Sequence, residues 1–122
     1  MPLATQTKTV LVVDDDPDIR LIVSWALEDK GYAVQTATNG REALEAVRRQ
    51  SPDAIVLDLN MPVMDGWSFI HAHQADATCR DVPIILMSAG QRIAQAQGLG
   101  AAAFVTKPFE LEVLVGTVAS FL

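Results

Sequence analysis

The chain alternates between two patterns of apolar residues. Continuous apolar runs are typical of strands buried on both faces, whereas apolar residues at every third or fourth position are typical of amphipathic helices. The first pattern predicts strands at residues 9–13, 33–37, 53–58, 82–87 and 102–106. The second predicts helices at residues 17–30, 42–50, 67–74, 91–97 and 111–122. Strands that alternate with helices predict a parallel sheet with helices on both faces.

Residues at the expected ends of the elements support these boundaries. Asp16 can cap the first helix, Pro17 suits its first position, and Asp18 complements the positive end of the helix dipole. Gly31 is expected to end that helix, and Asn39-Gly40 is expected to form a turn.

Five such units predict an α/β fold, the open doubly wound (βα)5 sheet of flavodoxin type with strand order 2-1-3-4-5. We expect the first and last helices on one face and the three middle helices on the other. No linker, repeat or low-complexity tract divides the chain, so residues 1–122 are expected to form one domain. Residues 1–7 are expected to be a flexible N-terminal tail, and no output domain is expected in the chain.

Composition limits the partners and the cellular compartment expected for the domain. The net charge is -6 and the isoelectric point is about 4.6, which disfavours binding to nucleic acids and to anionic membranes. A single cysteine excludes an intrachain disulfide, and no signal peptide or membrane span is predicted. These features favour a cytoplasmic protein.

Polar residues follow the predicted strands at one edge of the sheet, where such folds bind ligands. Asp14 and Asp15 follow the first strand, and Asp58 ends the third. Ser88 and Lys107 follow the fourth and fifth strands. Three neighbouring carboxylates suit Mg²⁺, and a carboxylate can attack phosphorus while a metal ion, an ammonium and a hydroxyl hold the phosphoryl oxygens. Each residue alone could be a helix cap or a turn residue, but coincidence at one edge is improbable.

Four stretches resemble the receiver domain of two-component response regulators, and together they cover essentially the whole chain. They are residues 12–16, 56–66, 85–89 and 99–109. The resemblance implies that Asp58 is the phosphate-accepting nucleophile. It implies that Asp15 binds Mg²⁺ directly, Asp14 through water, and Asn60 through its backbone carbonyl.

The resemblance also implies a switch. Ser88 matches the residue that bonds the phosphoryl group, Lys107 the lysine that pairs with it, and Phe104 the aromatic residue that turns inward. The bond between Lys107 and Pro108 is expected to be cis. In this switch, the surface formed by the helices expected at residues 91–97 and 111–122 and by the strand at 102–106 would change its packing.

The function implied is phosphoryl transfer from a histidine kinase or a histidine phosphotransfer protein to Asp58, which controls a downstream protein not identified by the sequence. The domain would be a signalling switch that hydrolyses its own acyl phosphate, not a metabolic enzyme. It would be a monomer or a phosphorylation-dependent dimer.

Three alternative functions make different demands on the sequence. A Mg²⁺-dependent phosphatase with an aspartyl nucleophile would need a second carboxylate near Asp58, where position 60 is Asn. A flavin mononucleotide carrier would need a phosphate-binding loop after the first strand, where carboxylates would repel phosphate. The third is a degenerate receiver that binds partners without phosphorylation, and the complete set of site residues disfavours it.

Two features depart from the expected pattern. The stretch from Ser88 to Lys107 is a few residues shorter than is common in the family and holds Gly90 and Gly98, so the helix at 91–97 is expected to be short. Leu21 and Trp25 lie off the apolar stripe of the first helix. They either pack against the last helix or form a contact patch for a phosphodonor.

Overall fold

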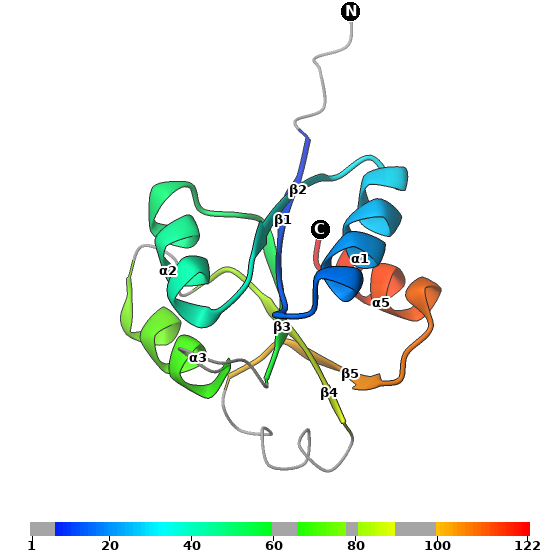
Figure 1. Ribbon diagram of the computed structural model, residues 1–122. Coiled ribbons are helices and arrows are strands. Elements are labelled where there is room, and N and C mark those ends of the chain that lie inside the picture. The colour runs from blue at the N-terminus through cyan, green and yellow to red at the C-terminus, as the bar shows by residue number, and fades with distance from the viewer. Residues whose placement is uncertain (1–6, 60–65, 78–80, 90–99) are drawn as a thin grey trace, which may run out of the picture.

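The computed structural model describes residues 7–59, 66–77, 81–89 and 100–122 and contains one five-stranded parallel sheet with the order β2-β1-β3-β4-β5 (Figure 1). The strands are β1 (Thr9–Val13), β2 (Ala33–Ala37), β3 (Ala54–Asp58), β4 (Ile84–Ala89) and β5 (Ala103–Lys107). The helices in this part of the chain are α1 (Pro17–Asp29), α2 (Gly40–Arg49), α3 (Gly66–Ala75) and α5 (Leu111–Ala119). The predicted fold class and strand order are confirmed.

Helices cover both faces of the sheet, and side-chain alternation along the strands divides the core in two. Leu11, Val13, Ile55 and Leu57 pack against α2 and α3. The intervening strand residues face α1 and α5, whose buried residues include Val23, Leu27, Leu114 and Val118. Helices α1 and α5 therefore share one face, as predicted, with α2 and α3 on the other. The predicted helix at 91–97 lies outside the described residues, as do residues 1–6.

The ends of α1 match their sequence signals. The Asp16 side chain accepts a hydrogen bond from the Asp18 amide at 2.9 Å, and Pro17 begins the helix. After the C-cap, Gly31 has φ +94°, and its amide donates to the Glu28 carbonyl while the Tyr32 amide donates to the Leu27 carbonyl. This pair of bonds is the Schellman motif, in which glycine takes the left-handed position.

Several element boundaries differ by one to three residues from the prediction, and three of the differences bear on named residues. Asn39 is not a free turn residue, because its side chain accepts from the Glu42 amide and caps α2, which begins at Gly40. Ser88 and Lys107 lie inside β4 and β5, because these strands pair for one to two residues beyond their apolar runs. The site residues on these strands are therefore held by the sheet ladder.

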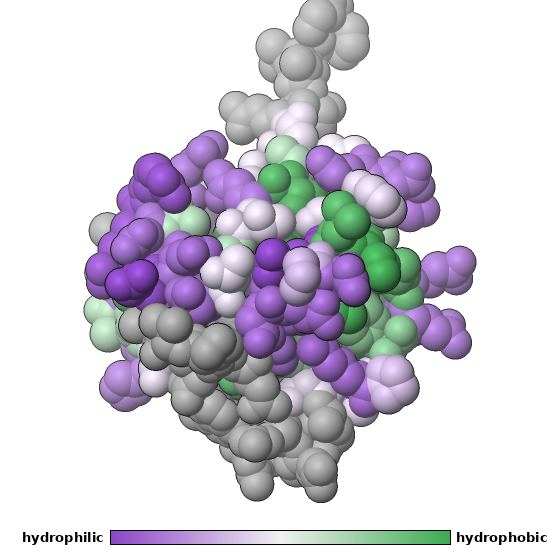
Figure 2. All heavy atoms as spheres, in the orientation of Figure 1, coloured by the Kyte–Doolittle hydropathy of each residue, from purple (hydrophilic) through white to green (hydrophobic). Residues whose placement is uncertain are grey.

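Leu21 and Trp25 lie on the exposed surface of α1. They are exposed by 47% and 62%, and Ile22 beside them is exposed by 43%. Figure 2 shows hydrophobic residues gathered over α1. This exposure favours the contact-patch interpretation, and these residues form with Ile22 a surface that we call the α1 patch. None of the helices in the described ranges is long and apolar enough to cross a membrane.

Candidate functional site

Three carboxylates converge where β1 and β3 end. Asp14 and Asp15 directly follow β1, and Asp58 is the last residue of β3, its neighbour in the sheet. One carboxylate oxygen from each lies within 4.8 Å of the others. The strand register thus brings together residues that are far apart in the sequence, as predicted.

Asp14 has a buried side chain and takes part in four hydrogen bonds through its backbone and its carboxylate. Its amide donates to the Ala37 carbonyl at 3.2 Å, and its Oδ1 accepts from the Asp16 amide at 2.9 Å. Its Oδ2 accepts from Lys107 Nζ at 3.3 Å, and its backbone carbonyl accepts from Arg20 Nη1 at 2.7 Å. Burial raises the pKa of Asp14, and the bonds from Asp16 and Lys107 offset part of that effect.

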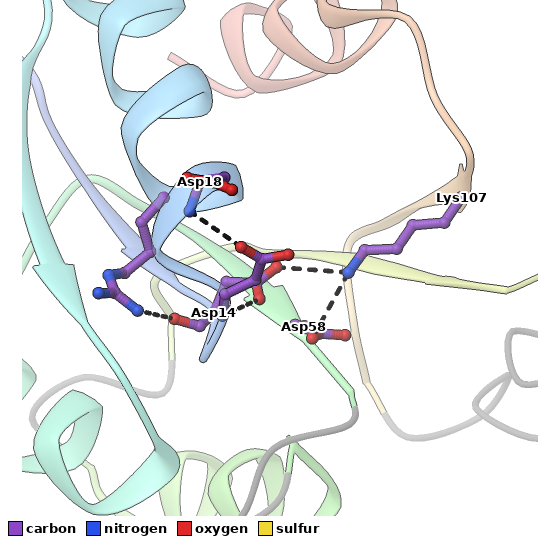
Figure 3. Close-up of polar contacts among 6 residues, drawn as sticks. Asp14, Asp18, Asp58 and Lys107 are labelled. Atoms are coloured by element: carbon purple, nitrogen blue, oxygen red, sulfur yellow. Dashed lines mark hydrogen bonds and ion pairs between the residues drawn. The ribbon is translucent and has the colours of Figure 1, made fainter.

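Lys107 places its ammonium between two carboxylates (Figure 3). Nζ lies 3.3 Å from Asp14 Oδ2 and 3.5 Å from Asp58 Oδ2, and the side chain is 30% exposed. One cation thereby balances part of the charge of the acidic cluster and stays within reach of solvent. A phosphoryl group arriving at Asp58 would meet this ammonium.

Ser88 occupies the strand between Asp58 and Lys107. Met87 pairs with Asp58 across β3 and β4, and Ala89 pairs with Lys107 across β4 and β5. Along β4, Ser88 therefore lies between the residue that pairs with Asp58 and the residue that pairs with Lys107. The residue is 1% exposed, and its hydroxyl has no hydrogen-bond partner among the described residues. An unpaired buried hydroxyl costs free energy, which a later partner could recover.

Phe104 and Pro108 flank the lysine on β5. Phe104 is half-buried and packs against the core cluster beneath α2 and α3 rather than facing solvent. Its position agrees with an inward-facing ring, although the ring is not fully enclosed. The peptide bond between Lys107 and Pro108 is cis, as predicted.

The donor set fits a hard divalent cation. Mg²⁺ prefers carboxylate and carbonyl oxygens completed by water, and the cluster offers one exposed and two buried carboxylates. Burial raises the pKa of Asp14 and so disfavours its charged form, which a bound cation would favour. Asn60, predicted to add its carbonyl, lies outside the described residues.

Arg20 is a site residue that the sequence analysis missed. It lies in the first turns of α1, where the helix dipole disfavours a cation, and it is the single basic residue between Pro17 and Asp29. Its hydrogen bond to the Asp14 carbonyl explains why a cation lies at this position of the helix. A lone arginine near an acidic helix start was the signal available in the sequence.

Comparisons with known proteins agree with the fold and show the family. The model of the response regulator receiver domain family matches residues 10–119. Transcriptional regulatory protein PrrA of Mycobacterium tuberculosis is 41% identical, and the match covers all of this chain but 53% of PrrA. Response regulator MprA of Mycobacterium leprae is 39% identical over 93% of this chain and 50% of MprA. The chain thus spans about half the length of these relatives.

Solved structures show the same similarity. Chemotaxis response regulator CheY4 of Vibrio cholerae matches with a TM-score of 0.88 and 36% identity, covering 96% of this chain and 100% of CheY4. The structure described as a "putative response regulator" from Chloroflexus aurantiacus matches with a TM-score of 0.89 and 29% identity, covering 95% of this chain and 98% of that protein. Since the family model spans nearly the whole chain and an entire relative superimposes on it, this chain belongs to the receiver domain family of two-component response regulators.

Proposed function

We propose that the domain accepts a phosphoryl group from a phosphohistidine donor onto Asp58, and that Mg²⁺ is required. The observation that carries the proposal is the position of Lys107 Nζ, 3.3 Å from Asp14 and 3.5 Å from Asp58, beside a cluster of three carboxylates. A nucleophile, a metal-binding pair and a phosphate-binding cation thus share one site.

In the proposed transfer, a carboxylate oxygen of Asp58 forms a bond to phosphorus. The bond between phosphorus and the donor imidazole nitrogen breaks, and its electron pair leaves with that nitrogen. Asp14 and Asp15 would hold Mg²⁺, which supplies positive charge to the phosphoryl oxygens when bound. Lys107 would neutralise a further phosphoryl oxygen, so part of the added charge would be balanced within the site.

Ser88 and Phe104 would convert the modification into a change of surface. The unpaired Ser88 hydroxyl lies one position beyond the residue that pairs with Asp58, so a phosphoryl oxygen offers it the partner it lacks. Movement of Ser88 towards that oxygen would leave space that the half-buried Phe104 fills. The two states then differ in the packing of β5 and α5, which is the surface read by a downstream protein.

The partner that donates phosphate would be a histidine kinase or a histidine phosphotransfer protein, and we propose the α1 patch as its contact. The patch is apolar and exposed by 43–62% at its three residues, and it lies on the helix that begins at the acidic site. In this proposal the domain is a cytoplasmic signalling switch rather than a metabolic enzyme, a monomer or a dimer formed on phosphorylation.

The proposal is tested with beryllium fluoride and Mg²⁺, which together mimic the aspartyl phosphate. Two-dimensional NMR spectra of wild type and Asp58→Asn are recorded with and without both reagents, and sedimentation is measured on the same samples. We expect shifts at Ser88 and Phe104 in the wild type only. A wild type that binds neither reagent would contradict the proposal and favour a degenerate receiver. Turnover of small phosphate esters would favour the phosphatase.

A further inference from the structure

The carbonyl of Asp14 is the point at which the backbone of the acidic site is anchored. The Asp14 amide continues the pairing of β1 with β2 by donating to the Ala37 carbonyl. In a parallel ladder the next bond would run back to the Asp14 carbonyl from residue 39. Among the described residues the Asn39 amide makes no such bond, although the Asn39 side chain caps α2, so β2 supplies no donor there.

Arg20 supplies that donor. Its Nη1 lies 2.7 Å from the Asp14 carbonyl oxygen, the shortest of the four contacts that hold Asp14. Among the described residues this is the one hydrogen bond of the guanidinium. The contact joins the second turn of α1 to the end of β1, and so it closes the connection that carries Asp14 and Asp15.

Holding this carbonyl also orients Asp15. The peptide group between Asp14 and Asp15 is planar, so fixing its oxygen fixes the direction in which the chain enters Asp15. Asp15 is exposed, and its carboxylate nevertheless lies within 4.8 Å of both Asp14 and Asp58. The bond from Arg20 therefore bears on the geometry of the carboxylate that burial does not restrain.

We propose that Arg20 is a positioning residue of the metal site, which holds the connection between β1 and α1 in the conformation that presents Asp14 and Asp15 together to a divalent cation. The inference rests on the proposed function, because it concerns the same site. Groups that orient metal ligands commonly contribute about 10- to 100-fold to metal affinity.

The sign of the effect separates positioning from charge. Arg20 is a cation close to a site for a cation, so charge alone predicts that its removal strengthens Mg²⁺ binding. Loss of positioning predicts the opposite, because Asp15 would then sample orientations that do not reach the cluster. A purely structural role predicts lower stability with no change in the Mg²⁺ affinity of the folded protein.

The test measures Mg²⁺ dissociation constants by isothermal titration calorimetry for wild type, Arg20→Met and Arg20→Lys. Arg20→Met keeps the apolar stem and removes charge and donors, and we expect about tenfold weaker binding. Arg20→Lys keeps a donor and a charge, and we expect it to recover most of the affinity. Lys30→Met is the matched control, because it removes one positive charge just beyond the other end of α1.

A second readout follows the backbone. The Asp16 amide, which donates to Asp14 Oδ1, is expected to shift in NMR spectra of Arg20→Met and to stay in place in Lys30→Met. Arg20→Gln, with a shorter amide side chain, replaces Arg20→Met if the latter does not fold, and the same loss is expected. Binding by these variants that equals or exceeds wild type would overturn the inference. A wild type that binds no Mg²⁺ would instead contradict the proposed function.

Discussion

The ammonium of Lys107 lies 3.3 Å from the carboxylate of Asp14, yet this contact does not fully offset the burial of that carboxylate. The pKa of Asp14 remains raised, with burial as the largest cause and the Asp15 charge as a smaller one. The metal-free site therefore stores unfavourable charge that a divalent cation or a proton can relieve.

We expect Asp14→Asn to stabilise the metal-free protein by up to about 1 kcal/mol, because a neutral amide replaces a buried charge. It is also expected to remove most of the stabilisation that Mg²⁺ gives the wild type. Urea unfolding with and without Mg²⁺ measures both effects.

The stability contributed by Asp14 is expected to depend on pH. Because the pKa of Asp14 is higher in the folded protein than in the unfolded chain, its contribution to stability is present at low pH and is lost as pH rises through the folded pKa. Asp14→Asn should lack that loss. Asp29→Asn, at the far end of α1, serves as the control and should respond to Mg²⁺ like the wild type.

Ser88→Ala tests the unpaired hydroxyl. Removing a buried hydroxyl that lacks a partner is expected to leave the unmodified protein unchanged or to stabilise it by up to about 1 kcal/mol. The same variant should lose part of the stabilisation by beryllium fluoride and Mg²⁺, because the phosphoryl mimic can no longer bond the hydroxyl. Thermal unfolding in both conditions measures the difference.

The chain offers a matched control for Ser88. Ser24 on α1 is also buried, and its hydroxyl also lacks a hydrogen-bond partner within the ranges that the structure describes. Ser24→Ala should therefore leave the stability of the unmodified protein unchanged or slightly raised, as Ser88→Ala does. Unlike Ser88→Ala, it should keep the full stabilisation by beryllium fluoride and Mg²⁺. An equal loss of the beryllium fluoride response in both variants would contradict a specific role for Ser88.

Trp25→Ala tests the α1 patch. The side chain is 62% exposed, so its removal is expected to change the free energy of unfolding by less than about 0.5 kcal/mol. Phosphotransfer from a protein donor should slow by tenfold or more if about 1.4 kcal/mol of binding is lost, whereas phosphorylation by acetyl phosphate should not change. Val113→Ala, an exposed apolar residue of α5, is the control. Equal rates with the protein donor would place its contact elsewhere.

His73 is expected to make stability depend on pH. It is 1% exposed, stacks on Phe69 at 5.7 Å between ring centroids, and its Nε2 donates to the Val82 carbonyl at 3.1 Å. Burial lowers its pKa below the ordinary 6.5. The unfolded chain therefore binds a proton before the folded protein does, and stability falls as pH drops below about 6.5.

Urea unfolding at several pH values measures this slope. His73→Gln can keep a donor near the Val82 carbonyl without titrating, so a smaller loss of stability on acidification is expected. His71→Gln, on the exposed side of the same helix, should retain the wild-type slope. Identical slopes for all three proteins would contradict the role of His73.

The sequence predicted the sheet because its strands are continuous apolar runs, and it predicted the acidic cluster because each carboxylate follows such a run. It did not predict that Ser88 and Lys107 lie within strands, since backbone pairing continues past the last apolar residue. Asn39 was ambiguous because asparagine favours both turns and helix caps. Arg20 was missed because its partner is a backbone carbonyl, and a lone arginine near an acidic helix start does not by itself identify that partner.

The strand order places some residues of the site beside central strands and others on an edge strand, which is easier to displace. Asp14 directly follows β1 and Asp58 ends β3, and both strands have neighbours on both sides and are almost fully buried. Lys107 ends β5, an edge strand with a single neighbour in the sheet. Displacing an edge strand breaks one ladder instead of two, so the compliant part of the site is the one that carries Lys107 and Phe104. In the proposed switch, a new charge at Asp58 would act on strands that are held on both sides, and β5 would be the strand that moves in response.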